Sequence, residues 1–134
     1  MTDCLFCKII EGKIPCTKVY ENDKVLAFLD ISPVSKGHTL VLPKKHYETI
    51  MDADEQTLYE LIKTVKKLSN AVMKAMKADG INVETNNKRA AGQLVPHLHV
   101  HLIPRFENDG LKFDWPTKKF PDMDEIAEKV KKAL

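Results

Sequence analysis

Residues 97–103, with the sequence HLHVHLI, alternate histidine with aliphatic side chains. Because successive side chains of a strand point to opposite faces, this alternation predicts a β-strand whose histidines share one face. The aliphatic residues then share the other face and pack into the core. His97, His99 and His101 would lie about 6–7 Å apart along the strand, which Pro104 is expected to end.

A row of three imidazoles on one strand has two chemical interpretations. Neutral imidazole is a common zinc ligand, so the row is typical of a metal site. An imidazole with a pKa near ~6.5 also attacks electrophiles or transfers protons at neutral pH, so the row is equally typical of a catalytic site. The heptapeptide alone leaves both interpretations open.

Four further strands are predicted upstream of this segment. Asn22-Asp23 is a turn signal that separates two apolar runs, which we interpret as a hairpin. A third strand precedes Pro43, and a fourth follows the only long helical pattern of the chain. The four predicted strands span residues 19–21, 25–29, 38–42 and 81–85.

One long helix is predicted between the third and fourth strands, from residue 54 to about residue 79. Its apolar residues recur at helical spacing on one stripe, namely Leu58, Leu61, Ile62, Val65, Leu68, Val72 and Met76. Asp52 or Asp54 is suited to cap its start, and Gly80 to end it. A short charged helix is predicted over residues 122–134. This order of elements indicates an α+β fold, a five-stranded antiparallel sheet with one long helix between strands 3 and 4 and a short C-terminal helix.

The composition is that of one ordinary domain over residues 1–134. The chain is 43% hydrophobic, and no linker, repeat or low-complexity run divides it. A net charge of +2 gives no reason to expect nucleic acid or a membrane as a partner, and no window is apolar enough for a membrane span. The N-terminus lacks the basic and apolar parts of a signal peptide, and three cysteines do not build a disulfide framework. We therefore expect a cytoplasmic protein.

Longer stretches around these elements carry a family resemblance. Residues 93–105, QLVPHLHVHLIPR, closely resemble the signature of the histidine-triad (HIT) family, in which three histidines alternate with apolar residues. Residues 30–33, DISP, and residues 37–46, GHTLVLPKKH, resemble the upstream half of the same family, and so do residues 4–10, CLFCKII. The likeness is greatest to the prokaryotic histidine-triad nucleotide-binding proteins.

The resemblance implies a hydrolase or transferase acting at the α-phosphate of a purine nucleotide, either a nucleoside phosphoramidate or a dinucleoside polyphosphate. His99 is then the nucleophile that forms a nucleotidyl-histidine intermediate. A backbone carbonyl of the Gly92-Gln93 turn is expected to hold its ring. His101 is expected to donate a hydrogen bond to the phosphate or the leaving group, with His38 as a third catalytic histidine. The alternatives are a non-catalytic nucleotide-binding or interaction protein, and a zinc hydrolase that uses the three histidines as ligands.

The same resemblance assigns residues to nucleotide contact. Asp30 matches the acidic residue that accepts hydrogen bonds from the ribose hydroxyls. Asn86, Gly92 and Gln93 belong to loops that meet the phosphate, and Leu94 stands where the family often has a hydroxyl residue. The apolar walls around the base are Phe6, Ile9, Phe28 and Ile31, side chains that would serve equally well in a core.

The resemblance also implies a structural zinc ion and no organic cofactor. Cys4 and Cys7 form a C-x-x-C pair, and His46 with His97 would complete a four-coordinate site. His97 is then a metal ligand, and the other two histidines of the row are the reactive pair. Cys16 is left as a structural residue.

Members of the family form homodimers, and the resemblance implies a contact made by the long helix and the fourth strand. A helix of about 25 residues is about 37 Å long, which is more than a small sheet covers. The core motifs lie within residues 4–105, and residues 106–134 form a variable segment. Near Trp115-Pro116 this segment is expected to approach the partner's pocket.

Overall fold

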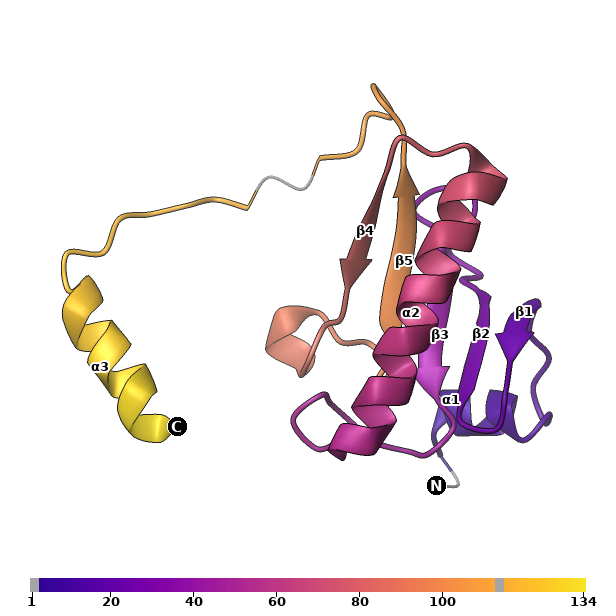
Figure 1. The fold of residues 1–134 in the computed structure, drawn as a ribbon, viewed down its shortest axis with the longest axis horizontal. Helices are drawn as coiled ribbons and strands as arrows, with labels where there is room; N and C mark the ends of the chain where they lie inside the picture. The colour runs from indigo at the N-terminus through magenta and orange to yellow at the C-terminus, as the bar shows by residue number, and fades with distance from the viewer. Residues whose placement is uncertain (1–2, 113–114) are drawn as a thin grey trace.

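Five strands form one antiparallel sheet in the computed structural model, which describes residues 3–112 and 115–134 (Figure 1). Their order is β1-β2-β3-β5-β4, so β5 is paired on both sides and β1 and β4 are the edges. The strands are β1 (Lys18–Glu21), β2 (Val25–Leu29), β3 (Thr39–Pro43), β4 (Gly80–Glu84) and β5 (Val100–Arg105). The helices are α1 (Leu5–Ile10), α2 (Glu55–Met76), the 3-10 helix η1 (Arg89–Ala91) and α3 (Met123–Ala133). The predicted α+β class and the position of the long helix are confirmed.

The β1–β2 hairpin forms where Asn22-Asp23 predicted a turn. The backbone N–H groups of Lys24 and Val25 both donate to the Asn22 Oδ1 atom at 2.8 Å. An asparagine side chain commonly stabilises a turn in this way. β2 then pairs with β3 along its full length, which places two buried strands beside the hairpin edge.

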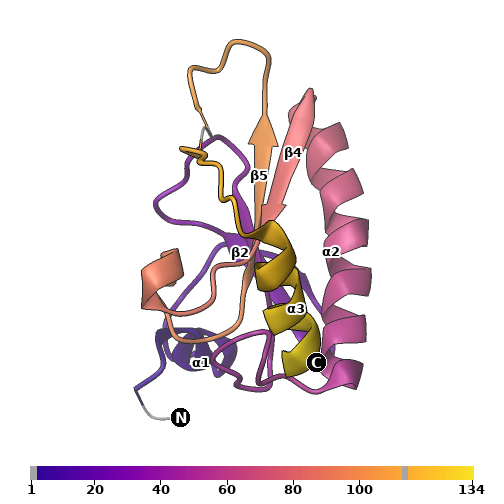
Figure 2. The same cartoon turned by 90° about the vertical axis from the view of Figure 1, so that its left-hand side faces the viewer.

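α2 covers one face of the sheet (Figure 2). Most of the predicted apolar stripe is the buried side of this helix, where Leu61, Val65, Leu68 and Val72 lie. Ile62, which the prediction included, is instead 53% exposed on the outer side. They pack against alternate residues of the strands and of the segment before β5: Val25, Ala27, Val41, Leu98, Val100 and Leu102. The aliphatic positions of the histidine segment therefore face the core, as the alternation predicted.

The start of α2 agrees with the sequence pattern, but its end does not. Asp54 is the N-cap, because its side chain accepts a backbone N–H of the first turn at 2.7 Å. The helix ends at Met76, and Lys77 adopts the left-handed conformation with φ of 53°. The N–H of Ala78 donates to the Met73 carbonyl in the last turn at 3.0 Å, so the helix ends in this way although no glycine occupies the left-handed position. Gly80, the predicted stop, is instead the first residue of β4.

The opposite face of the sheet carries α1, a helix that the sequence pattern did not predict (Figure 2). Phe6 and Cys7 of α1 are buried with residues of β2 and β3, namely Leu26, Phe28, Leu40 and Leu42. With six residues, α1 is too short to show a helical period in the sequence. The histidines project on this same side of the sheet, since their aliphatic neighbours face α2.

β5 begins later than predicted, because the backbone carbonyls of the residues before it accept hydrogen bonds from side chains and not from a neighbouring strand. The strand was expected over residues 97–103, yet it starts at Val100, so His97 and His99 precede it. The His97 carbonyl accepts a hydrogen bond from the His99 ring at 2.6 Å. The His99 carbonyl accepts one from Thr85 Oγ1 at 2.8 Å.

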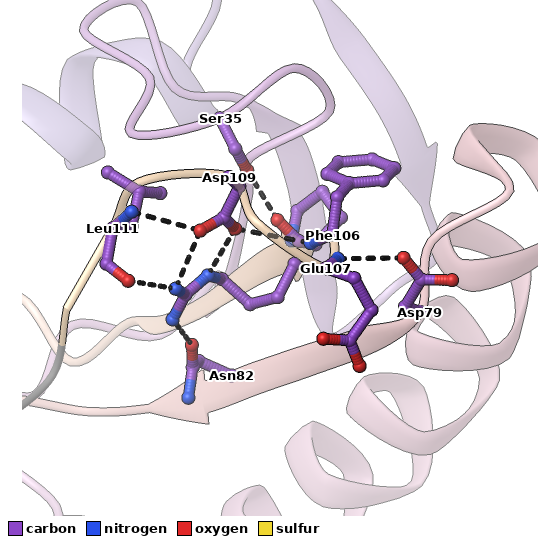
Figure 3. Close-up of polar contacts among 9 residues, drawn as sticks. Ser35, Asp79, Asn82, Phe106, Glu107, Asp109 and Leu111 are labelled. Atoms are coloured by element: carbon purple, nitrogen blue, oxygen red, sulfur yellow. Dashed lines mark hydrogen bonds and ion pairs between the residues drawn. The ribbon is translucent and has the colours of Figure 1, made fainter.

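β5 also continues through its predicted end at Pro104. Pairing with β3 stops at Leu102, so the missing N–H of Pro104 costs no hydrogen bond on that side. The Arg105 guanidinium then holds the following turn: Nε and Nη2 donate to the Asp109 carboxylate at 2.8 and 3.0 Å, and Nη1 donates to Asn82 Oδ1 at 2.9 Å (Figure 3). These bonds set the direction in which the chain leaves the sheet.

The C-terminal segment runs away from the sheet and ends in α3, which stands apart from the other elements (Figure 1). Every residue from Trp115 to Leu134 is exposed, including the apolar Ile126 and Val130 of α3. Among residues 3–112 and 115–134, the structure has no helix with the length and hydropathy of a membrane span.

Candidate active site and metal centre

A cavity of about 490 Å³ opens beside the histidines, between α1, the loop after β2 and the segment before β5. Cavities of this size hold small organic ligands. Its lining includes the catalytic candidate His38. It also includes every residue assigned above to nucleotide contact except Gln93: Phe6, Ile9, Phe28, Asp30, Ile31, Asn86, Gly92, His99 and His101.

His99 is held in one tautomer by the backbone. Its Nδ1 lies 2.6 Å from the His97 carbonyl oxygen, and because a carbonyl only accepts, Nδ1 carries the proton. The acceptor is therefore His97, and the prediction that the Gly92-Gln93 turn supplies it is wrong. Burial lowers the pKa of His99, which favours the neutral ring. The unprotonated Nε2 is left with a free electron pair.

His38 and His101 form a hydrogen-bonded pair with a defined direction. The backbone N–H of Val34 donates to His38 Nδ1 at 3.0 Å, so a neutral His38 carries its proton on Nε2. This Nε2–H donates to His101 Nδ1 at 2.9 Å. The proton of His101 is then on Nε2, where it serves as a donor. Burial lowers the pKa of His101 to about 4 and also lowers that of His38.

Asp30 lies next to this pair at the end of β2. Its Oδ2 is 3.5 Å from His38 Nε2, and its Oδ1 accepts the Ser32 N–H at 2.8 Å. Its charge raises the pKa of His38, against the larger effect of burial. Each carboxylate oxygen has more than one lone pair, so acceptor capacity is left for a hydroxyl in the cavity.

The apolar walls of the cavity come from α1, β2 and two loops. Phe6 meets Phe28 edge to face, with ring centroids 5.6 Å apart, and it meets His99 in the same way at 5.0 Å. These phenyl rings belong both to the core and to the cavity. Ile31 and Leu94 are each 92% exposed, so they are rim residues and have no role in the core.

Gln93 is placed differently from the other predicted contact residues. Its Oε1 accepts the Lys88 N–H at 2.8 Å, and its Nε2 donates to the Glu48 carbonyl at 2.6 Å. Both ends of the amide therefore stabilise the loop between β4 and β5. Asn86 lines the cavity from the same loop.

Cys4, Cys7, His46 and His97 converge on one point, with all ligand atoms within 4.8 Å of one another. The His97 Nδ1 is 3.4 Å from Cys4 Sγ, 3.6 Å from Cys7 Sγ and 3.2 Å from His46 Nδ1. A tetrahedral zinc ion with ordinary bond lengths needs separations of about 3.6 Å between sulfur and nitrogen and about 3.3 Å between nitrogens. The donor set and its spacing fit zinc.

The rings and thiols of this cluster are also suited to a metal chemically. His97 Nε2 lies 2.8 Å from the Pro43 carbonyl, to which it donates, so its Nδ1 has the free pair that a ligand needs. Burial and the neighbouring Cys4 raise the pKa of the Cys7 thiol to about 11, so binding must displace that proton. Cys16 lies outside the cluster and packs on the α1 side of the core.

The three histidines do not converge on a single metal. His97 belongs to the cysteine cluster, and among the described residues His99 belongs to no group with metal-ligand spacing. Asp30, His38 and His101 also lie within 4.8 Å of one another. However, His38 Nε2 lies only 2.9 Å from His101 Nδ1, which is the distance of a hydrogen bond between the two rings.

Sequence reasoning missed the backbone groups that orient the rings. The carbonyl of His97 and the N–H of Val34 have no signature in residue type. Thr85, the residue after β4, donates to the His99 carbonyl from a position fourteen residues away in the sequence.

An antiparallel sheet that presents an oriented, unprotonated imidazole nitrogen in an apolar cavity, with a second imidazole N–H beside it, defines a protein of the histidine-triad class. The HIT domain profile matches residues 11–108. The chain belongs to the HIT family.

Relatives of known sequence agree over most of the chain. An uncharacterised HIT-like protein of Methanocaldococcus jannaschii is 50% identical over 128 residues, covering 96% of this chain and 98% of that protein. An adenosine 5'-monophosphoramidase of Schizosaccharomyces pombe is 44% identical, covering 85% of this chain and 84% of that protein. An adenylylsulfatase of Arabidopsis thaliana is 46% identical, covering 81% of this chain and 55% of that protein.

Solved structures share the fold. SMU.412c from Streptococcus mutans superimposes with a TM-score of 0.93 at 46% identity, covering 99% of this chain and 86% of that chain. A zinc-bound histidine triad family protein from Mycobacterium smegmatis superimposes with a TM-score of 0.79 at 32% identity, covering 99% of both chains.

Proposed function

We propose that this protein is a nucleotide hydrolase or transferase that acts at the α-phosphate of a purine nucleotide through a nucleotidyl-histidine intermediate on His99. The observation that carries the proposal is the orientation of that ring, which leaves Nε2 unprotonated beside the cavity. Relatives named adenosine 5'-monophosphoramidase and adenylylsulfatase support a nucleotide hydrolase.

The reaction proceeds in two steps. His99 Nε2 attacks the α-phosphorus, a bond forms between nitrogen and phosphorus, and the bond to the leaving amine or phosphate breaks. The leaving group takes the bonding electron pair and receives the proton from His101 Nε2. Water then attacks the phosphorus, returns a proton to His101 and displaces His99 as the free imidazole. A second acceptor in place of water makes the reaction a transfer.

The remaining cavity residues orient the nucleotide. Phe6 and Phe28 provide flat apolar surface for a base, and the Asp30 carboxylate provides acceptors for the ribose hydroxyls. This arrangement supports a purine nucleoside, because a purine has more flat surface to place against these walls than a pyrimidine has.

The test compares wild type with His99→Ala on an adenosine 5'-phosphoramidate and on a diadenosine polyphosphate. We expect kcat to fall by at least about a thousandfold, while AMP still binds within a few-fold of the wild-type affinity. In a single turnover with labelled substrate, the wild type should carry labelled adenylate on His99. Equal turnover by both proteins contradicts the proposal, and tight binding without label favours a nucleotide-binding protein that is not an enzyme.

We also propose that the cluster of Cys4, Cys7, His46 and His97 holds a structural zinc ion. Its separations match a tetrahedral zinc site, and a zinc-bound protein of the same family supports the assignment. When bound, zinc crosslinks α1 to the loops after β3 and before β5 and supplies no reacting group. With these four residues as ligands the site would be closed, as structural zinc sites are.

A homodimer formed through α2 and β4 is the third part of the proposal. β4 is an edge strand, and Val83 on it is 48% exposed although it pairs with the buried Leu102. Ile62 and Tyr59 on the outer side of α2 are also exposed. An edge strand beside exposed apolar helix residues is the kind of surface that a second copy covers.

A further inference from the structure

We propose that the metal centre positions the nucleophile of this protein through His97, so that metal binding and nucleotide binding are energetically coupled. The inference rests on the function proposed above and deepens it. In this scheme His97 is a positioning residue, because it acts on the phosphate only through the His99 ring that it holds.

His97 takes part in both sites at once. Its fully buried ring donates from Nε2 to the Pro43 carbonyl at 2.8 Å and faces the sulfur atoms of Cys4 and Cys7 with Nδ1, at 3.4 and 3.6 Å. Its backbone carbonyl accepts the Nδ1–H of His99 at 2.6 Å. One residue therefore supplies a metal ligand and the acceptor that sets the tautomer of the nucleophile.

Ligation holds the His97 ring from a second side and, with it, the carbonyl of the same residue. Without a metal, Nδ1 of the His97 ring has no ligand bond, and the His97 carbonyl can shift relative to the His99 ring. Displacement of a catalytic group by about 1 Å can cost about a hundredfold in rate. The hydrogen bond of 2.6 Å from His99 Nδ1 to the His97 carbonyl should therefore lengthen or break when the metal is removed.

α1 provides a second connection between the two sites. Cys4 caps this helix and Cys7 lies within it, so two of the four ligands attach it to the sheet. Phe6, between them, meets His99 edge to face with ring centroids 5.0 Å apart and meets His97 at 6.0 Å. A helix of six residues does not persist alone in water, so loss of the metal weakens this cavity wall.

Coupling between two binding sites is reciprocal. If zinc favours the arrangement that binds nucleotide, nucleotide must tighten zinc by the same factor. Such factors are typically about 5–150-fold, and we expect about tenfold here because one hydrogen bond and one ring contact connect the sites.

The test measures both halves of the coupling in the full-length protein, with AMP as the probe. Zinc transfer from the loaded protein to a chromophoric chelator is followed with and without saturating AMP, after correction for zinc bound by AMP itself. AMP affinity is measured by calorimetry before and after zinc removal. We expect AMP to tighten zinc about tenfold and zinc removal to weaken AMP binding about tenfold.

Nitrogen NMR of the imidazoles reads the tautomer of His99 without any turnover. We expect the Nδ1–H form in the loaded protein, a mixture of tautomers after zinc removal, and recovery when zinc is added back. A metal that contributed only to global stability would leave the tautomer unchanged in the folded, zinc-free protein.

Cys7→Ser removes a ligand without altering the His97 carbonyl, and Cys16→Ser is its matched control because that thiol lies outside the cluster. We expect Cys7→Ser to bind AMP about tenfold more weakly and Cys16→Ser to match wild type. If the zinc-free forms do not fold, the chelator competition on the loaded wild type still decides the question.

The outcomes separate the coupling from the proposals beneath it. Zinc affinity that AMP changes by less than twofold, with AMP bound, overturns the coupling and leaves the proposed function standing. A loaded protein that does not bind AMP overturns the proposed function and the coupling together. A chain that retains no zinc overturns the metal centre and the coupling.

Discussion

At the scale of single residues, the site is a set of imidazoles whose protons are placed by the backbone. The His97 carbonyl fixes His99, the Val34 N–H fixes His38, and through His38 it fixes His101. Because these donors and acceptors are already in place, the rings need little reorganisation when a phosphate enters. The proton positions in the site therefore depend on backbone groups as well as on the histidine side chains.

The low pKa of His101 predicts how stability varies with pH. In the fold this ring titrates at about 4, whereas an unfolded imidazole titrates near ~6.5, so the unfolded chain binds the proton first as the pH falls. The stabilisation is fully present above pH ~6.5 and is lost between pH ~6.5 and ~4. From pH 7 to pH 5, wild type should lose about 1–2 kcal/mol more than His101→Asn, which lacks the titrating group.

Urea titrations of the zinc-loaded proteins at both pH values measure this difference. Comparison with His101→Asn isolates the contribution of this ring and its interactions with His38 and His99, because the rest of the chain is the same in both proteins. If both proteins lose the same free energy of unfolding, His101 titrates in the fold as it does in the unfolded chain, and the prediction is wrong.

At the scale of elements, one glycine sets the approach of β3 to α2. Gly37 has φ of +97°, and a Cβ placed on it would lie 2.6 Å from Met76 Cγ at the end of α2. Gly37→Ala should therefore combine backbone strain with a clash and destabilise the fold by about 2–4 kcal/mol. Gly12 has a similar φ of +77° with nothing within 4 Å, so Gly12→Ala should cost only about 1–2 kcal/mol.

Chemical denaturation of both glycine variants gives the two costs. Their difference isolates the contact with Met76, because the backbone strain is common to both. Equal costs would show that the methionine side chain moves away without a penalty, and that the strand–helix approach does not depend on glycine.

The elements also show what the sequence predicted and what it did not. Apolar periodicity placed α2 and the core side of the histidine segment, because burial of one face is a local pattern. The predicted start of β5 was wrong. The side chains of Thr85 and His99 donate to backbone carbonyls that would otherwise pair with a neighbouring strand, and such contacts between distant residues leave no local sequence pattern. Cys4 and His97 are 93 positions apart in the sequence, and only the fold shows that the four ligand atoms lie within 4.8 Å of one another.

At the scale of the whole molecule, the sheet has two edges with different surroundings. β1 carries Val19, which is 43% exposed, and β4 carries Val83, which is 48% exposed. β4 contacts α2, and Ile62 and Tyr59 on the outer side of that helix are exposed apolar side chains. A second copy that pairs along the β4 edge would bury backbone groups and these apolar side chains together.

These two edges provide the test of the dimer. Val83→Glu should convert the dimer to monomer at micromolar concentration, because it buries a charge in the proposed interface at a cost of several kcal/mol. Val19→Glu adds the same charge to a valine of similar exposure and should leave the dimer intact. Sedimentation velocity of wild type and both variants gives the masses. A wild type that sediments as a monomer contradicts the dimer, and dissociation by Val19→Glu alone would place the contact at the β1 edge instead.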